Sequence, residues 1–331
     1  MKNDLFDHTS RHLYEIVKSS RSLLLIPHQK PDGDALGSST AFAEWLSSIG
    51  KPYQFYCATD SPKNFAYIPH VSEITSNPAV WKDQNFDTIV VFDSGDLRYA
   101  GVATLIGGLP NTPTILNIDH HATNEMYGEV NLVGTHFSST CEVVFQFFTL
   151  NEIPINSSMA TSLLTGLITD TDHFTNAATS SASLDVASFL MNKSGKHHHI
   201  KETIYNRTSL DAFKLWGEMF ERLQKNDDLE LVYTYLTQAD LKKFSLNESE
   251  AEGMSNFMNA ISEGKAGLLL KEVEENTWKG SFRTTSDEVD VARIAKALGG
   301  GGHKKAAGFT VQGTREEAFE KIFQIMKEMN F

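Results

Sequence analysis

The chain has 331 residues and a formal net charge of −13 at pH 7, with 40% hydrophobic and 21% charged residues. This length and composition fit a folded protein of one large domain or, more simply, of two ordinary ones. The acidic balance argues against a protein that follows a long duplex nucleic acid, because such binding needs many Lys and Arg contacts with phosphates.

The lack of a long apolar segment and of clustered cysteines narrows the class of protein further. The sequence has no run of eighteen apolar residues, and its start lacks the apolar core of a signal peptide, which predicts a cytoplasmic protein without a membrane partner. Cys57 and Cys141 are the only cysteines and lie far apart, so neither a disulfide framework nor a cysteine zinc cluster is indicated. Metal chemistry would have to use oxygen and imidazole ligands.

The first half of the chain alternates short apolar runs with helical patterns. Residues 22–27 predict a buried strand, and residues 34–49, stopped by Gly50, predict a helix. The ranges 87–93 and 113–119 predict further strands, and the ranges 139–150, 157–168 and 181–191 predict helices. Such alternation predicts a mostly parallel sheet flanked by helices, which binds its ligands at the carboxyl ends of the strands.

The second half predicts a smaller mixed α/β domain. The domain boundaries are expected at 1–192, 193–225 and 226–331, where the middle range holds connecting helices and a His197–His199 run that we interpret as solvated linker. In the last domain, strands are predicted at 229–237, 266–273 and 277–285. The range 289–303 predicts a helix that runs into a glycine loop, and the segment 305–313 with a final helix over 315–329 completes the domain.

The stretch from His28 to Asp34, with Asp32 between them, has two interpretations. It is either a turn that caps a helix, or part of a metal site in which a loop aims two aspartates at neighbouring cations. Aspartate with histidine favours manganese, iron, cobalt or magnesium. Because Asp93 and the triplet Asp119–His121 also end separate apolar runs, the metal interpretation is favoured.

Four segments resemble the motifs of the DHH phosphoesterase superfamily: "HQKPDGDALGS", "VVFDSGD", "IDHHATN" and "LITDTDHF". Further along, "SFRTT" and "ALGGGGHKKAAGF" resemble its DHH-associated C-terminal domain. The resemblance spans nearly the whole chain, and it is greatest to the NrnA-like group of bacterial nano-RNases and 3'-phosphoadenosine 5'-phosphate (pAp) phosphatases. It implies an active site in the cleft between an N-terminal DHH domain and a smaller C-terminal domain.

The same resemblance implies a centre of two divalent ions, with Mn²⁺ expected and Fe²⁺, Co²⁺ or Mg²⁺ as alternatives. The two catalytic residues would be His121, which would face the substrate phosphate, and Asp119, which would orient a neighbouring imidazole. The implied metal ligands are His28 and Asp32 for one ion, Asp34, His120 and Asp170 for the other, and Asp93 as a bridge between both.

The fourth motif departs from the Asp-Thr-Gly of the superfamily. Here Asp170 is followed by Thr171, Asp172 and His173, so an aspartate stands where a glycine is typical. The alignment favours Asp170 as the ligand and leaves Asp172 as the alternative. We expect His173 to be exposed to solvent rather than to contact phosphate. Asn124, after the triplet, either contacts substrate or turns the chain.

The C-terminal motifs imply a substrate-binding set. Arg283 would grip a phosphate, although a lone arginine on a strand is also a common surface residue. The glycine loop would let backbone N–H groups approach an anion, or would only permit a tight turn. In the superfamily this loop closes over substrate, which assigns substrate binding to Gly300, Gly301, Gly302 and His303.

These features predict a hydrolase that uses two-metal-activated hydroxide. The expected substrates are short oligoribonucleotides, cleaved to mononucleotides, and pAp, cleaved to AMP and phosphate. The alternatives are a cyclic or linear dinucleotide phosphodiesterase, an exopolyphosphatase and a non-catalytic nucleotide-binding sensor. The resemblance also suggests a homodimer.

Overall fold

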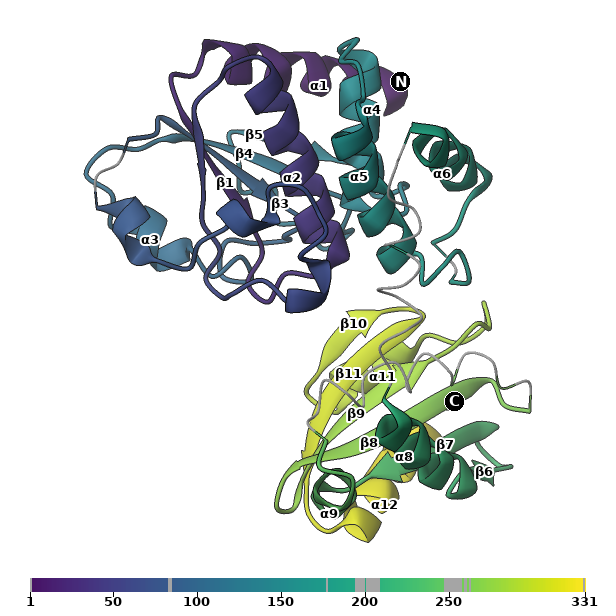
Figure 1. Cartoon of the computed structure of the whole chain (residues 1–331). Helices are drawn as coiled ribbons and strands as arrows, with labels where there is room; N and C mark the ends of the chain where they lie inside the picture. Colours follow the sequence, from purple (N-terminus) through teal and green to yellow (C-terminus); the bar gives the residue numbers. More distant parts are fainter. Residues whose placement is uncertain are drawn as a thin grey trace. The chain divides into compact units, whose positions relative to one another are not determined.

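The computed structural model describes residues 2–82, 85–176, 178–193, 200, 209–246, 258, 261, 263–329 and 331. The chain folds into two compact units, Met1–Asn206 and Arg207–Phe331 (Figure 1). The predicted His197–His199 run lies outside the described residues. Within the described part of the chain, every helix is too short or too polar to cross a bilayer.

The first unit is a five-stranded, wholly parallel sheet with strand order β2-β1-β3-β4-β5. Its elements in chain order are α1 (Lys2–Ser19), β1 (Leu23–Pro27), α2 (Gly33–Ser48), β2 (Tyr53–Phe55), η1 (Lys63–Phe65), η2 (Val71–Glu73), η3 (Pro78–Trp81), β3 (Thr88–Phe92), α3 (Ala103–Gly107), β4 (Thr114–Asp119), β5 (Val130–Val133), α4 (Thr140–Leu150), α5 (Ser157–Asp170) and α6 (Ser181–Lys193). The predicted mostly parallel sheet is confirmed, while the short strands β2 and β5 were not predicted.

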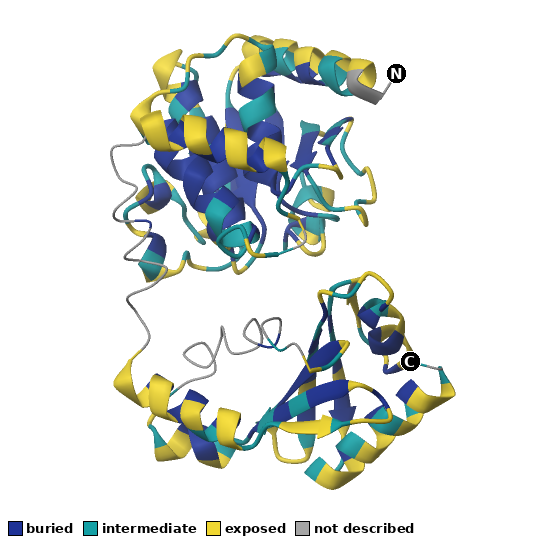
Figure 2. Ribbon diagram, turned by 90° about the vertical axis from the view of Figure 1, so that its right-hand side faces the viewer, coloured by how far each residue is buried: buried dark blue, intermediate teal, exposed yellow. Residues whose placement is uncertain are grey.

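The sheet is covered on both faces, which explains its continuous apolar strands. Alternate residues of β1 point to opposite sides: Leu25 joins a core with α2, α4 and α5, whereas Leu24 joins a second core with Trp81 and Val102. Strands β1 and β3 are buried along their whole length (Figure 2). Because all strands are parallel, the polar residues that follow β1 and β3 and end β4 meet at one edge.

Helices α2 and α5 cross at glycines, and the crossing places two carboxylates near each other. A Cβ atom on Gly37 of α2 would overlap the backbone carbonyl oxygen of Ser162 in α5. A Cβ atom on Gly166 of α5 would lie 2.9 Å from the Cα of Asp34. Without these side chains the two backbones approach closely. Asp34, near the start of α2, therefore comes close to Asp170, the last residue of α5.

The second unit is a six-stranded sheet with strand order β10-β11-β9-β8-β7-β6, in which only the β7–β8 pair is parallel. Helices α11 and α12 pack on one face, and α8 and α9 pack on the other. Its elements are α8 (Leu210–Glu221), β6 (Gln224–Asn226), β7 (Leu231–Leu236), α9 (Gln238–Lys243), β8 (Ala266–Glu274), β9 (Thr277–Arg283), α11 (Val291–Ala297), β10 (Gly301–His303), β11 (Ala306–Gln312) and α12 (Arg315–Glu328).

The glycine segment that follows the predicted helix forms a turn and then a strand. Helix α11 ends at Ala297, and Gly301–His303 instead pair with β11 as strand β10. Gly299 and Gly302 have φ angles of 81° and 141°, which only glycine adopts without strain. The glycine run therefore ends the helix and reverses the chain into a strand.

His70 ties the 3₁₀ segment after β2 to helix α2. Its Nε2 donates to Glu44 at 2.6 Å and its Nδ1 donates to Glu73 at 2.7 Å. Both ring nitrogens donate only in the imidazolium form. Burial lowers the pKa of His70, but the two hydrogen bonds to Glu44 and Glu73 outweigh it and raise the pKa above its usual value. The same segment packs on α2 through Phe65, Ile68 and Val71 against Leu36.

We expect Gly37→Ala to destabilise the first unit by about 1–3 kcal/mol, because the new methyl group would meet the backbone of α5. Gly107→Ala is the matched control, since a Cβ atom there meets nothing within 4 Å. Urea unfolding of both variants would test this, and equal stability of the two would contradict the close helix crossing.

We expect His70→Asn to destabilise the protein more near pH 6 than near pH 9.5. Asparagine tolerates the left-handed φ of 63° at this position but carries no charge. A raised folded-state pKa gives stability that is fully present below the unfolded pKa of about 6.5 and is lost as pH rises through the folded value. Urea unfolding should show a loss of roughly 1–3 kcal/mol near pH 6. An equal loss at both pH values would exclude this ion-pair contribution.

Candidate metal centre

All six predicted metal ligands meet at the carboxyl edge of the parallel sheet. His28 follows β1, Asp93 follows β3, and His120 follows β4, while the remaining aspartates come from the ends of α2 and α5. Three groups of side chains each bring their ligand atoms within 4.8 Å of one another: His28 with Asp32 and Asp93, Asp34 with His120 and Asp170, and Asp93 with His120 and His121.

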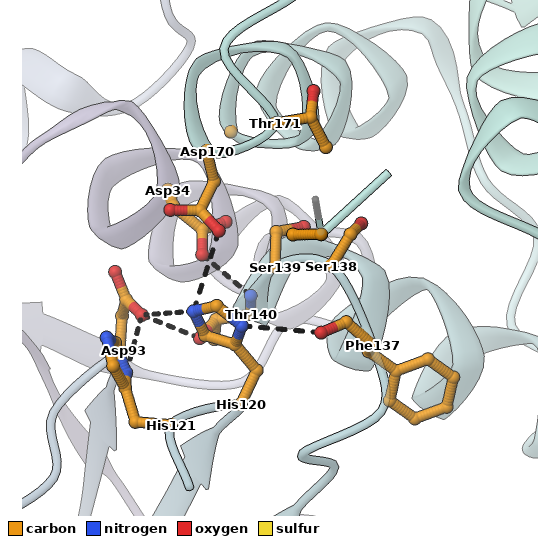
Figure 3. Close-up of polar contacts among 12 residues, drawn as sticks. Asp34, Asp93, His120, His121, Phe137, Ser138, Ser139, Thr140, Asp170 and Thr171 are labelled. Atoms are coloured by element: carbon orange, nitrogen blue, oxygen red, sulfur yellow. Dashed lines mark hydrogen bonds and ion pairs between the residues drawn. The ribbon is translucent and has the colours of Figure 1, made fainter. Parts of the chain in front are cut away.

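Two histidines are oriented by backbone carbonyl groups. His28 Nδ1 donates to the carbonyl oxygen of Gln29 at 2.8 Å, and His120 Nδ1 donates to that of Phe137 at 3.4 Å (Figure 3). Each ring is thus fixed with its Nε2 toward the carboxylates. This arrangement is common for metal-bound imidazole, because the second nitrogen selects the tautomer and holds the ring.

The spacing of these groups fits a divalent ion. His28 Nε2 lies 3.6 Å from Asp93 Oδ2, and His120 Nε2 lies 3.6 Å from Asp170 Oδ2. Both distances are too long for a hydrogen bond and are close to the separation of two ligands that share one ion. His120 Nε2 is buried without a hydrogen-bond partner among the described residues. A coordinated metal would satisfy this nitrogen.

The N-terminus of helix α4 holds two of the aspartates. Both oxygens of Asp34 accept backbone N–H groups, from Thr140 at 2.6 Å and from Cys141 at 2.9 Å. The hydroxyl group of Thr140 donates to Asp93 Oδ1 at 2.8 Å (Figure 3). Helix N-termini favour negative charge. Sequence reasoning missed this role, although Ser139 before a helical run carried the signal of an N-cap.

The carboxylates repel one another strongly. Burial raises the pKa of Asp34 well above its usual range, and the charges of Asp93 and Asp170 add to the effect. Burial likewise raises the pKa of Asp170 to about 7, against the opposing effect of His120. For Asp93, the neighbouring imidazoles of His28, His120 and His121 outweigh burial, and its pKa falls below its usual range. Divalent cations would relieve this repulsion.

His121 is held by Asp119, which is fully buried. His121 Nδ1 donates to Asp119 Oδ1 at 2.7 Å, and Asn124 Nδ2 donates to the other oxygen at 2.6 Å. Burial lowers the pKa of His121, but this hydrogen bond and the nearby carboxylates outweigh it and raise the pKa to about 9. Of the two roles left open for Asn124, the chain-turning one agrees with its Oδ1, which accepts the backbone N–H of Met126 at 2.7 Å, while its amide nitrogen also positions Asp119.

Comparison with known proteins identifies the family. The sequence matches the DHH family, N-terminal domain, over residues 22–167, and the DHHA1 domain over residues 228–329. The chain belongs to the DHH phosphoesterase superfamily. The predicted family is therefore confirmed.

Similar proteins match over nearly the full DHH–DHHA1 chain. The bifunctional oligoribonuclease and PAP phosphatase NrnA of Thermus thermophilus is 28% identical over 96% of this chain and 93% of its own. A probable protein of the same name from Streptococcus mutans is 24% identical over 95% of this chain and 96% of its own. The crystal structure of an exopolyphosphatase-related protein from Bacteroides fragilis has the same fold, with a TM-score of 0.88, 23% identity and 97% and 96% of the two chains covered.

In the fourth DHH motif, Asp170 is the aspartate that lies among the candidate metal ligands. Among the described residues, the candidate metal groups contain Asp170 and not Asp172. Asp172 and His173 have φ angles of 48° and 62°, in the left-handed region. A glycine would adopt this turn with less strain, which is a physical reason for the residue usual in the superfamily. The side chain of His173 is 28% exposed, so it is only partly open to solvent.

The predicted substrate-binding residues lie in the DHHA1 unit. Ala306 of strand β11 pairs with Arg283 at the end of β9 on one side and with His303 of β10 on the other side. The structure thus brings Arg283 and the strand Gly301–His303 to one end of one sheet. Arg283 is half-buried and donates to the carbonyl oxygen of Phe282 at 3.0 Å.

We expect Thr140→Val to weaken Mn²⁺ binding by about 10-fold, because it removes the hydroxyl group that orients Asp93 while keeping the side-chain shape. Thr140→Ser retains the hydroxyl group and should bind Mn²⁺ nearly as the wild type does. Isothermal titration calorimetry would measure both, with thermal melts to verify folding. Equal affinity of the valine and serine variants would show that this hydrogen bond has no part in the centre.

Proposed function

We propose that the chain is a metal-dependent phosphoesterase that cleaves short oligoribonucleotides to mononucleotides and converts pAp to AMP and phosphate. The observation that carries this proposal is the overlap of the three candidate metal groups: the group of Asp93, His120 and His121 shares Asp93 with the second group and His120 with the third, which favours two adjacent ions. The names of the similar proteins from Thermus thermophilus and Streptococcus mutans support the substrates.

In this proposal His28 and Asp32 would hold one ion, Asp34, His120 and Asp170 would hold the second, and Asp93 would be a ligand of both. The expected pair of Mn²⁺ ions would supply a hydroxide nucleophile near neutral pH and would neutralise charge on the phosphoryl oxygens. The mixed oxygen and imidazole ligands are compatible with Mn²⁺.

His121 and Asp119 are the proposed catalytic residues. With its Nδ1 donating to Asp119, the His121 ring is held in one orientation, and this hydrogen bond favours the protonated form of the imidazole. A protonated imidazole at this place would stabilise charge on the phosphoryl group or give a proton to the leaving oxygen. No protein nucleophile is required.

Substrate choice is assigned to the DHHA1 unit. Arg283, the loop Gly300–Gly302 and His303 would bind a terminal phosphate or nucleotide. The proposed division gives catalysis to residues 1–192 and substrate binding to residues 226–331, with 193–225 as the connection. Short substrates suit this acidic chain, because they have few phosphates that need to be neutralised. We further propose a cytoplasmic homodimer.

We expect Asp93→Asn to abolish Mn²⁺-dependent turnover without unfolding the protein, because the neutral amide is a poor bridge between two cations. Asp185→Asn is the matched control, since Asp185 is exposed on α6. Activity would be measured side by side on a diribonucleotide, pAp, cyclic di-AMP and polyphosphate. Retained activity in Asp93→Asn with bound metal would overturn the metal assignment.

The substrate panel also separates the alternatives. Turnover of the diribonucleotide and pAp above the other two is expected. A preference for cyclic di-AMP or polyphosphate would instead support a dinucleotide phosphodiesterase or an exopolyphosphatase. Binding without turnover on all four would favour a nucleotide sensor.

A further inference from the structure

Tyr99 is an aromatic residue that is half exposed beside the metal centre. Its exposed fraction is 52%, and its ring centroid lies 5.1 Å from that of His28, with the planes tilted by 42°. His28 in turn faces Asp93 and Asp32. A single exposed aromatic side chain is common on protein surfaces. This one differs because it contacts a proposed metal ligand.

The turn that carries Tyr99 is firmly held. Asp96 Oδ1 accepts the backbone N–H groups of Arg98 at 2.7 Å and Tyr99 at 2.9 Å. The next residue, Ala100, is fully buried, and a Cβ atom on Gly101 would lie 2.7 Å from the Cβ of Ala58. The turn after β3 is thus packed against the chain that follows β2. The ring of Tyr99 is held at a defined place rather than on a loose loop.

We propose that Tyr99 is a base-stacking residue, which binds a nucleobase of the substrate while the neighbouring phosphate lies at the metal centre. This inference rests on the proposed function and sharpens it. Every nucleobase has a π-face, so stacking on an aromatic ring is tolerant of sequence and suits an enzyme that degrades short RNA of any sequence. Polyphosphate has no base and gains nothing from Tyr99, so this residue favours nucleotides over polyphosphate.

The ring, rather than the hydroxyl group, carries this role. Stacking on an aromatic side chain contributes about 1–3 kcal/mol per base, which corresponds to about 5- to 150-fold in affinity. The competing explanation is that Tyr99 only keeps His28 in place. That role would affect metal binding and would weaken all phosphate ligands equally, whereas base stacking affects only ligands with a base.

Equilibrium binding of AMP and of ribose 5-phosphate to the Mn²⁺-loaded full chain tests the proposal, since these two ligands differ by the base alone. Wild type, Tyr99→Phe and Tyr99→Leu would be compared by calorimetry, and the Mn²⁺ affinity of each would be measured separately. We expect Tyr99→Leu to lose about 5- to 150-fold in AMP affinity, with ribose 5-phosphate and Mn²⁺ affinities unchanged. Tyr99→Phe should retain the preference for AMP.

Three results for Tyr99→Leu would each overturn the stacking role. These are an equal loss of affinity for AMP and ribose 5-phosphate, a weaker affinity for Mn²⁺, and an unchanged preference for AMP over ribose 5-phosphate. Because the assay measures binding and needs no turnover, its failure is distinct from failure of the proposed function. For substrates, the same variant should raise KM for the diribonucleotide and leave kcat nearly unchanged. A fall in kcat with constant KM would contradict the proposal.

Discussion

Three negatively charged carboxylates lie close together at one edge of the parallel sheet, and the structure around them must stabilise this arrangement. Asp34 and Asp93 are almost fully buried, and Asp170 lies beside them. Burial and mutual repulsion oppose ionisation of Asp34 and Asp170, as their raised pKa values show. Such a cluster persists only where other groups offset the repulsion. Imidazole rings and backbone N–H groups do so in part, and the proposed cations would complete it.

The arrangement of the helices supplies that compensation. The glycine crossing of α2 and α5 brings Asp34 close to Asp170, which alone would be unfavourable. Helix α4 begins at the same place, so that its first N–H groups bind Asp34 and the hydroxyl group of Thr140 binds Asp93. The close approach that creates the repulsion is therefore matched by a helix N-terminus that reduces it. Fold and site follow from one packing geometry.

The polar residues at the edge of the sheet were predictable from sequence, whereas several side chains that hold them in place were not. Apolar runs that end in Asp93 and in the triplet from Asp119 indicate parallel strands with polar ends, and the DHH motifs identify the family. The hydrogen bonds of Thr140 to Asp93 and of Asn124 to Asp119 could not be predicted, because they depend on how helices and turns pack. Tyr99 resembles any surface tyrosine until its ring is seen against His28. The short strand Gly301–His303 was not predicted, because a run of glycines carries no apolar alternation that would indicate a strand.

Asp32 shows why the first motif had two interpretations that are in fact compatible. It is the N-cap of α2, and its Oδ1 accepts the N–H groups of Asp34 at 2.9 Å and Ala35 at 3.1 Å. The same oxygen lies 3.8 Å from His28 Nε2. A cap fixes the side-chain rotamer, because only one orientation reaches the helix N–H groups. The helix cap therefore holds the carboxylate toward His28, so that the turn that begins the helix also orients the proposed metal ligand.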